Sequence, residues 1–332
     1  MIRIFRSYHP AIIFLLLLYV ALFRVSLLFF AVPFVPPASS GYLSTLTFQL
    51  LDWVIGSKNY IYHLVALALV FFQALYFNFM INQYRILSRP SYVPALSYVL
   101  ISSLLIEFTL LTPALMANTF LLFACSKILS CYRKERVSPV IFDAALLVSI
   151  ASLFFFPYIV FFLFVIASLM VLRPFSIREY FFALTGLVLP YYFIGVYFFW
   201  NHRLNDFWQT FQITQLNLPL QEIERSSRVI ICGVSILFVL LWNLFFVQSN
   251  LMKMVVQVRS SITLFILFFF AGIFSLLIQF NGELDHFIWL AVPAGLAFSL
   301  FFVESRRRWM AEIFHFLLLL SALFFQYYYL NK

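Results

Sequence analysis

The side chains that could do chemistry are few in this chain of 332 residues, because only 10% of them are charged. Carboxyl and imidazole groups can transfer protons or position an acceptor, so the places where they gather are candidate sites. Most of them stand between apolar runs or at the ends of such runs. This polar set comprises Asp52, His63, Glu107, His202, Asp206, Glu283, Asp285 and His286.

Asp52 is the first candidate for a general base, since it is the only acid in the segment 35–59. It stands in the stretch LSTLTFQLLDWVI, whose mixture of polar and apolar residues predicts a helix lying on the membrane surface. Such a helix needs a polar face in any case, so a purely structural role for Asp52 is the alternative. Glu107 could act as the base in place of Asp52 only if the site were arranged in a different geometry.

Three arginines are candidates for holding a phosphate group. Arg203 and Arg225 stand in the polar segment 201–228, and guanidinium groups bind phosphate in a bidentate manner. The alternative is that these two arginines lie in a solvated loop and bind no phosphate. Arg24 lies within an apolar run, where a charge needs a partner, a route to the membrane surface or an anionic ligand.

The sequence predicts no metal site and no cofactor. His63, His202 and His286 could converge on a divalent metal, but their spacing matches no ligand pattern. No phosphate-binding glycine loop, dinucleotide fingerprint or HExxH motif is present in the chain.

Composition restricts the class of protein. Hydrophobic residues make up 64% of the chain and aromatic residues 21%, with a mean hydropathy of +1.01. A soluble domain usually carries roughly 25% charged residues, and disorder requires low hydrophobicity. These values indicate an all-α, polytopic membrane protein that forms a single integral domain over residues 1–332.

Apolar runs predict about eleven spans of the bilayer. They cover residues 11–34, 60–82, 92–107, 113–131, 138–155, 157–172, 179–200, 229–248, 261–280, 286–303 and 309–328. Two loops of some length, 35–59 and 201–228, would lie outside. Pro113 should end the interruption that begins at Glu107, and Pro157 should mark the tip of a hairpin.

Basic residues predict the orientation of these spans. With the N-terminus inside and the C-terminus outside, 15 of the 21 Lys and Arg residues fall on the cytoplasmic side. This distribution explains the net charge of +9 without a nucleic-acid partner. Asp143, close to the inner end of its span, is expected to pair with one of these cytoplasmic basic residues.

A pattern of hairpins over residues 111–210 resembles the GT-C superfamily of membrane glycosyltransferases. The pattern runs from LLTP through YRKER and FDAALLVSIASLFFFP to VLRPFSIREYFFALTGLVLPYYFIGVYFF. The resemblance implies a GT-C-like bundle that takes a sugar from a polyprenyl phosphate, with an Asp of the first outer loop as base. This chain departs from that pattern, because Val35–Thr47 contains no acid. It also resembles an uncharacterised family of Bacteroidota integral membrane proteins.

The sequence therefore supports three hypotheses for a bacterial inner-membrane protein. The first is transfer or handling of a polyprenyl-phosphate-linked sugar or envelope lipid at the outer face, with membrane lipids as partners. The second is a non-catalytic subunit or scaffold that binds envelope proteins, which the missing loop acid favours. The third is a lipid flippase or transporter, which the scarcity of charge within the spans disfavours.

Overall fold

The computed structural model describes residues 1–29, 41–56, 59–132, 134, 137–205, 207, 254–278, 284–305 and 308–330. Every regular element in these ranges is helical, which confirms the all-α class for the described part of the chain. The α-helices are α1 (Ile2–Phe5), α2 (Ile12–Phe29), α3 (Tyr42–Ile55), α4 (Asn59–Gln83), α5 (Val93–Ile101), α6 (Pro113–Leu129), α7 (Ser138–Phe154), α8 (Phe161–Leu172), α9 (Ile177–Trp200), α12 (Val256–Ile278), α13 (Ala291–Glu304) and α14 (Arg308–Leu330). The described part of the chain also contains the short 3₁₀ helices η1 (Glu107–Thr109), η2 (Phe156–Val160) and η4 (Leu284–Leu290).

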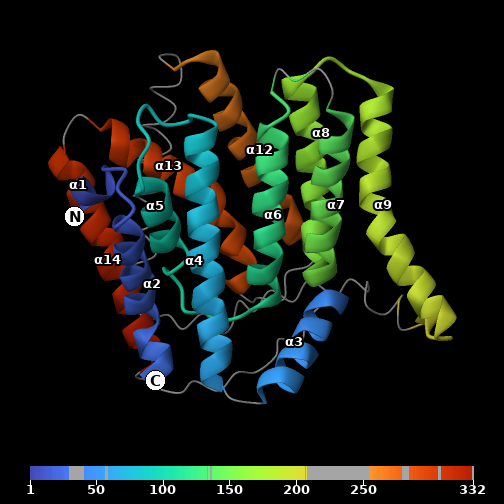
Figure 1. The fold of residues 1–332 in the computed structure, drawn as a ribbon, viewed down its shortest axis with the longest axis horizontal. Helices are drawn as coiled ribbons and strands as arrows, with labels where there is room; N and C mark the ends of the chain where they lie inside the picture. The colour runs from blue at the N-terminus through green and yellow to red at the C-terminus, as the bar shows by residue number, and fades with distance from the viewer. Residues whose placement is uncertain are drawn as a thin grey trace.

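The long helices stand side by side in a bundle, and α3 lies at one end of it (Figure 1). Within the described ranges, five helical segments are long and apolar enough to cross a membrane: Tyr60–Gln83, Ile177–Trp200, Val256–Ile278, Leu284–Glu304 and Trp309–Gln326. Shorter apolar helices accompany them over Ile12–Arg24, Pro113–Leu129, Ser138–Phe154 and Phe156–Leu172. The chain is thus a multi-pass membrane protein by helix length and composition. The count of eleven spans stays a prediction, and the expected span 229–248 lies outside the described residues.

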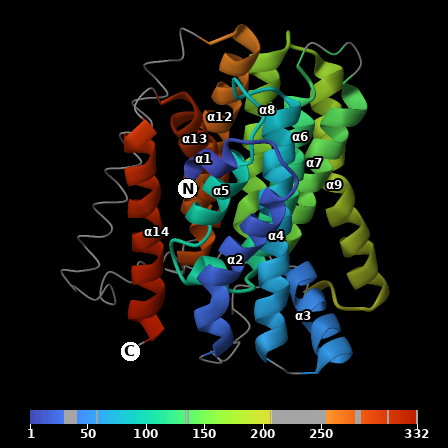
Figure 2. The same cartoon turned by 60° about the vertical axis from the view of Figure 1, so that its left-hand side comes forward.

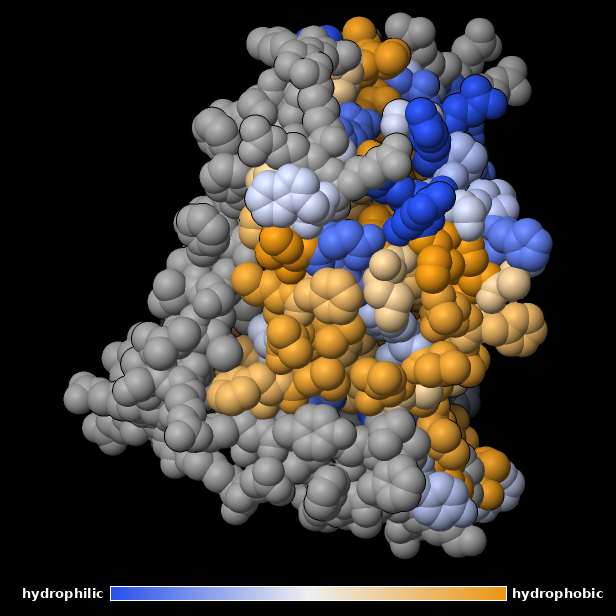
Figure 3. Space-filling model, turned by 90° about the vertical axis from the view of Figure 1, so that its left-hand side faces the viewer, coloured by the Kyte–Doolittle hydropathy of each residue, from blue (hydrophilic) through white to orange (hydrophobic). Residues whose placement is uncertain are grey.

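The outer surface of the bundle is apolar, as contact with lipid requires. Phe14 of α2 is 79% exposed and Trp200 of α9 is 81% exposed. Figure 3 shows a band of hydrophobic side chains across the middle of the face that carries the start of the chain, with hydrophilic side chains gathered above it. Large exposed apolar areas of this kind are rare on soluble monomers.

Proline positions mark the helix boundaries that the sequence predicts. Pro113 is the first residue of α6, and the Thr112 hydroxyl caps this helix by accepting a hydrogen bond from the main-chain N–H of Leu115 at 3.2 Å. Pro157 lies in η2, which turns the chain from α7 into α8. Both expectations about chain breaks are therefore confirmed.

One expected helix is much shorter than its apolar run. The prediction of a span over 92–107 is wrong in detail, since α5 ends at Ile101 and a buried, non-helical segment follows. Such a segment leaves main-chain groups that need other partners. Gln326 of α14 provides one by donating from Nε2 to the carbonyl of Ser103 at 3.1 Å. A contact with a helix 223 residues away in sequence thus supports the non-helical segment, and no local pattern predicts it.

Helix α3 is attached to the end of α7 by main-chain contacts. The N–H of Gly41 donates to the carbonyl of Phe154 at 3.0 Å. A Cβ at position 41 would lie 2.3 Å from the carbonyl oxygen of Leu153, so only glycine permits this approach. We refer to this end of the bundle as the α3 end.

Candidate functional site

A fully buried arginine lies inside the bundle. Arg24 of α2 has 0% exposed surface, and none of its Nε, Nη1 and Nη2 atoms has a hydrogen-bond partner within the described residues. Helix α2, which carries Arg24, packs against α4 and α5. A buried, unpaired guanidinium is costly in free energy, and such groups inside a membrane protein mark sites for anions or for other charges.

Tyr98 is the centre of a buried hydrogen-bond network that joins three helices. Its hydroxyl donates to Oε1 of Gln73 on α4 at 2.7 Å and accepts from Nδ2 of Asn118 on α6 at 2.9 Å. Nε2 of Gln73 donates to the Leu115 carbonyl at 2.8 Å and to the Thr119 hydroxyl at 2.7 Å. We call Gln73, Tyr98, Asn118 and Thr119 the Tyr98 cluster.

The Tyr98 cluster lies deep in the bundle. Gln73 stands fourteen residues from the start of α4 and ten from its end, or about 21 Å and about 15 Å along the helix axis. Asn118 retains one orphaned atom, because its buried Oδ1 has no hydrogen-bond partner in the described ranges. Among the described residues, three donor atoms of Arg24 and one acceptor atom of Asn118 therefore have no hydrogen-bond partner.

A second polar group lies nearer the α3 end. Asp285 and His286 of η4 are both buried, and η4 packs against η1 and α6. The Tyr158 hydroxyl donates to the main-chain carbonyl of His286 at 3.0 Å, and the imidazole Nε2 of His286 lies 3.0 Å from the Ser275 hydroxyl.

Asp52 is separate from these buried groups. It is exposed near the end of α3, and its carboxylate accepts a hydrogen bond from the Tyr62 hydroxyl of α4. Within the described residues, no hydrogen bond or ion pair joins Asp52 to Arg24. An exposed carboxylate held by one tyrosine can accept a proton from a molecule at the membrane surface.

Glu107 lies in η1, in the turn between α5 and α6, where η1 contacts η4. Burial raises the pKa of the Glu107 carboxyl, because removal from water disfavours the charged form. The two acids that the sequence singles out thus differ in environment. Asp52 faces outward, whereas Glu107 is half-buried beside the second polar group.

The structure does not bring the three candidate arginines together. Arg203 is exposed just after α9, and α9 stands at the edge of the bundle away from α2 (Figures 1 and 2). Arg225 lies outside the described residues. A phosphate clamp made jointly by Arg24 and Arg203 is therefore not formed in this arrangement.

The remaining polar candidates divide in a similar way. His202 is exposed at the end of α9, with a positive φ of 56°, whereas His63 of α4 is buried. Asp206 and Glu283 fall outside the described residues. Where the structure describes the chain, no three His, Cys, Asp or Glu side chains gather closely enough to hold a metal ion.

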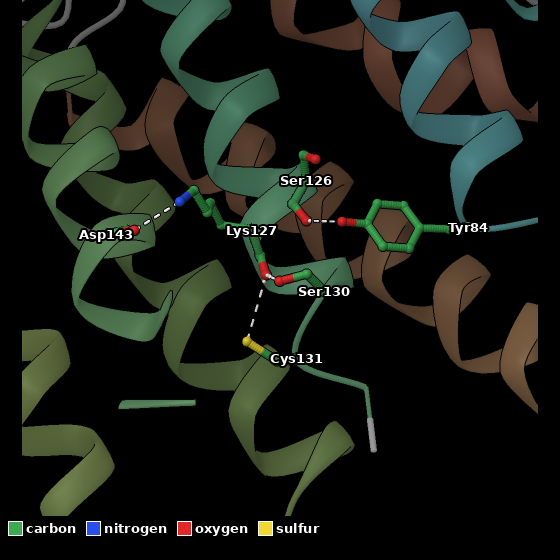
Figure 4. A network of polar contacts seen from close by, with 6 residues as sticks. All are labelled: Tyr84, Ser126, Lys127, Ser130, Cys131 and Asp143. Atoms are coloured by element: carbon green, nitrogen blue, oxygen red, sulfur yellow. Dashed lines mark hydrogen bonds and ion pairs between the residues drawn. The ribbon is translucent and has the colours of Figure 1, made fainter. Parts of the chain in front are cut away.

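The end of the bundle opposite α3 has its own polar contacts. Nζ of Lys127 on α6 forms an ion pair of 2.7 Å with Asp143 on α7 (Figure 4). This contact confirms the expected pairing of Asp143 with one of the basic residues predicted to be cytoplasmic. Both side chains are nearly half exposed, so the pair joins α6 to α7 with a small stabilisation.

Four residues of the Tyr98 cluster, Gln73, Tyr98, Asn118 and Thr119, are missing from the sequence-based candidates. Gln73, Tyr98 and Asn118 are uncharged, and a polar residue within an apolar run is the one signal that could have identified them. Their grouping depends on how α4, α5 and α6 pack.

Comparison with family models, curated proteins and solved structures found no match to this chain. A function can therefore be proposed only from the chemistry and positions of its residues.

Proposed function

We propose that this protein binds the phosphate of a polyprenyl-linked sugar or a related envelope lipid in a bacterial inner membrane. The single observation that supports this proposal is the buried guanidinium of Arg24, which lacks a hydrogen-bond partner among the described residues. A phosphate would provide both the charge and the acceptor atoms that this group needs. The apolar surface of the bundle is suited to the lipid chain.

Binding to the purified protein tests this proposal directly. Wild-type protein and the Arg24→Gln variant would be placed in phosphatidylcholine nanodiscs and titrated with undecaprenyl phosphate, with bound lipid counted by native mass spectrometry. We expect the variant to bind at least tenfold more weakly, because glutamine keeps hydrogen-bonding capacity but loses the charge. Equal binding by the two proteins would refute the proposal.

In the enzymatic form of the proposal, a GT-C-like transferase, Asp52 accepts the proton of an acceptor hydroxyl. The hydroxyl oxygen then bonds to the anomeric carbon while the lipid phosphate leaves. The exposed position of Asp52 on α3 supports this role. Sugar transfer from a polyprenyl donor should fall at least a hundredfold in Asp52→Asn. Transfer at the wild-type rate would remove Asp52 from the mechanism.

A lipid flippase is the second candidate function, and the depth of the Tyr98 cluster favours it. Gln73 lies about 21 Å and about 15 Å from the two ends of α4, and Arg24 is fully buried, which suits a head group that passes through the bundle. Translocation of a fluorescent polyprenyl phosphate in proteoliposomes separates this function from transfer. Translocation that survives Asp52→Asn but not Arg24→Gln would favour the flippase. Absence of lipid binding together with a stable envelope-protein partner would favour the scaffold.

A further inference from the structure

An arginine occupies a backbone position after α4 that normally belongs to glycine. The N–H of Ile86 donates to the Ile81 carbonyl, and the N–H of Arg85 donates to the Asn82 carbonyl, both at 3.1 Å. These two bonds define a Schellman motif, in which the residue at the position of Arg85 has a left-handed backbone. Arg85 accordingly has a φ of 50°. A Cβ is unfavourable in this conformation, so the arginine is present at a cost in stability.

The loop that begins at Arg85 is held in a defined shape. The two residues after Arg85 are buried and fix the loop to the bundle. At its other end, Nδ2 of Asn82 donates to the Ser91 carbonyl at 3.0 Å, and Oδ1 of Asn82 accepts from the Ser91 N–H at 3.2 Å. Between these anchors, Arg85 and Arg89 are both exposed. The loop therefore presents two guanidinium groups from a fixed backbone.

The start of the chain and the start of α12 lie beside this loop. The N–H of Tyr92 donates to the Phe5 carbonyl at 2.9 Å, and the rings of Tyr8 and Tyr92 stack with their centroids 5.2 Å apart. Nε2 of Gln257 on α12 lies 3.5 Å from the carbonyl oxygen of Tyr84. Each of these two neighbouring segments adds one more exposed arginine. We call the resulting set the Arg85 surface: Arg3, Arg85, Arg89 and Arg259.

The Arg85 surface lacks negative charge of its own. The segments 1–9, 84–92 and 254–259 contain no Asp and no Glu. Glu312 of α14 reaches the start of the chain, but it pairs there with the N-terminal ammonium at 3.1 Å. Among the described residues, no carboxylate forms an ion pair with any arginine of this surface. Clustered positive charges without counter-charges attract an anion from outside the chain.

Exposed apolar side chains lie in the same segments as these arginines. Ile4 is 50% exposed, Tyr8 is 59% exposed and Val255 is 72% exposed. On the face that carries the start of the chain, hydrophilic side chains gather directly above the hydrophobic band (Figure 3). A molecule with an anionic head and an apolar tail would match both kinds of side chain, whereas a soluble acidic partner would match the arginines alone.

We infer that the Arg85 surface binds the head group of an anionic phospholipid in the leaflet at this end of the bundle. Arg85 keeps its unfavourable backbone conformation because its guanidinium contacts the lipid phosphate. The loop lies at the end of the bundle opposite α3 (Figure 1), so neither Arg24 nor Asp52 belongs to this site. The inference is therefore independent of the proposed function. In the predicted orientation this leaflet is the cytoplasmic one.

The experiment uses a substitution that the turn itself favours. Wild type, Arg85→Gly and Arg89→Gln are placed in phosphatidylcholine nanodiscs and titrated with tetraoleoyl cardiolipin, and bound lipid is counted by native mass spectrometry. Arg89→Gln tests the same surface without changing the turn. Arg178→Gln is the matched control, because Arg178 is exposed at the start of α9, at the far edge of the bundle (Figure 1). Its guanidinium carbon lies 5.7 Å from the centroid of the Phe182 ring.

We expect Arg85→Gly and Arg89→Gln each to bind cardiolipin about fivefold more weakly than wild type, and Arg178→Gln to bind it as wild type does. Arg85→Gly should melt at the wild-type temperature or above it, because glycine is unstrained at this position. Wild-type affinity in both loop variants overturns the inference. An equal loss in Arg178→Gln also overturns it, since the basic residues would then act through general charge alone.

A soluble acidic ligand tests the kind of partner. Wild-type protein in the same nanodiscs is titrated with a poly-glutamate peptide at charge concentrations equal to those of cardiolipin. We expect cardiolipin to bind and the peptide to bind at least tenfold more weakly, because the peptide leaves the exposed apolar side chains in water. Tighter binding of the peptide than of cardiolipin overturns the lipid assignment and favours an acidic protein partner.

Discussion

The hydroxyl of Tyr98 donates a 2.7 Å hydrogen bond to the amide oxygen of Gln73, so α5 and α4 share a polar contact in the interior of the bundle. Both residues are 0% exposed. The contact belongs to a buried network in which Thr119 and Asn118 also take part, and Oδ1 of Asn118 has no hydrogen-bond partner among the described residues.

Tyr98→Phe should destabilise the protein by about 1–3 kcal/mol, because it leaves Oε1 of Gln73 and Nδ2 of Asn118 without their buried partner. Thermal unfolding in detergent measures the effect. Tyr84→Phe is the matched control, since it removes a hydroxyl that donates to the Ser126 carbonyl at 2.9 Å on a half-buried side chain (Figure 4). A larger loss of stability in Tyr84→Phe than in Tyr98→Phe would contradict the central role of Tyr98.

Gly186 allows α9 to approach α7. A Cβ at this position would lie 2.5 Å from the carbonyl oxygen of Phe142, so Gly186→Ala should cost about 1–3 kcal/mol and loosen α9. Gly195 provides a control in the same helix, because its Cβ would meet nothing closer than the Phe207 ring at 3.8 Å. Thermal unfolding and protease sensitivity of α9 should change for Gly186→Ala alone. Equal effects of the two substitutions would show that the α7 contact does not govern the packing of α9.

Glu107 should make stability depend on pH. Burial raises its folded-state pKa above the unfolded value, so the folded protein binds this proton more readily. Below the unfolded-state pKa, the Glu107 carboxyl therefore has no effect on the free energy of unfolding. As the pH rises through the folded-state pKa, the carboxyl loses its proton and lowers the free energy of unfolding. Glu107→Gln should be more stable than wild type at pH values above the folded-state pKa of Glu107. Below the unfolded-state pKa, the two proteins should be similarly stable.

Melting temperatures of wild type and Glu107→Gln across pH 4 to 8 measure this difference. Asp143→Asn is the control, because that carboxylate is nearly half exposed and pairs with Lys127. Identical pH profiles for wild type and Glu107→Gln would show that the carboxyl has no share in the pH dependence.

The predicted orientation places Asp52 outside and Asp143 at the cytoplasmic end. Single cysteines at these positions, in a chain whose native cysteines are replaced by serine, should react with a membrane-impermeant maleimide from opposite sides. Asp52→Cys should label in intact spheroplasts, and Asp143→Cys only in inverted vesicles. Labelling of both from the same side would contradict the topology. The reverse assignment would place α3 in the cytoplasm.

The sequence determined the class of protein and most helix boundaries. Apolar runs are long enough to define α4, expected over 60–82 and found over Asn59–Gln83, and proline places the start of α6 at Pro113. The surface helix expected at 43–55 corresponds to α3. These features depend on the length of apolar runs and on residues close in sequence, which is why they can be read locally.

Tertiary structure decided how short α5 is and which polar side chains meet. The end of α5 at Ile101 is tolerated because Gln326 of the distant α14 donates a hydrogen bond to the buried carbonyl of Ser103. Likewise, Gln73 and Asn118 are 25 and 20 residues from Tyr98 in sequence, and only helix packing brings them to its hydroxyl. A buried hydrogen bond requires two atoms to approach within about 3 Å, and no pattern of residue types along one chain encodes that distance.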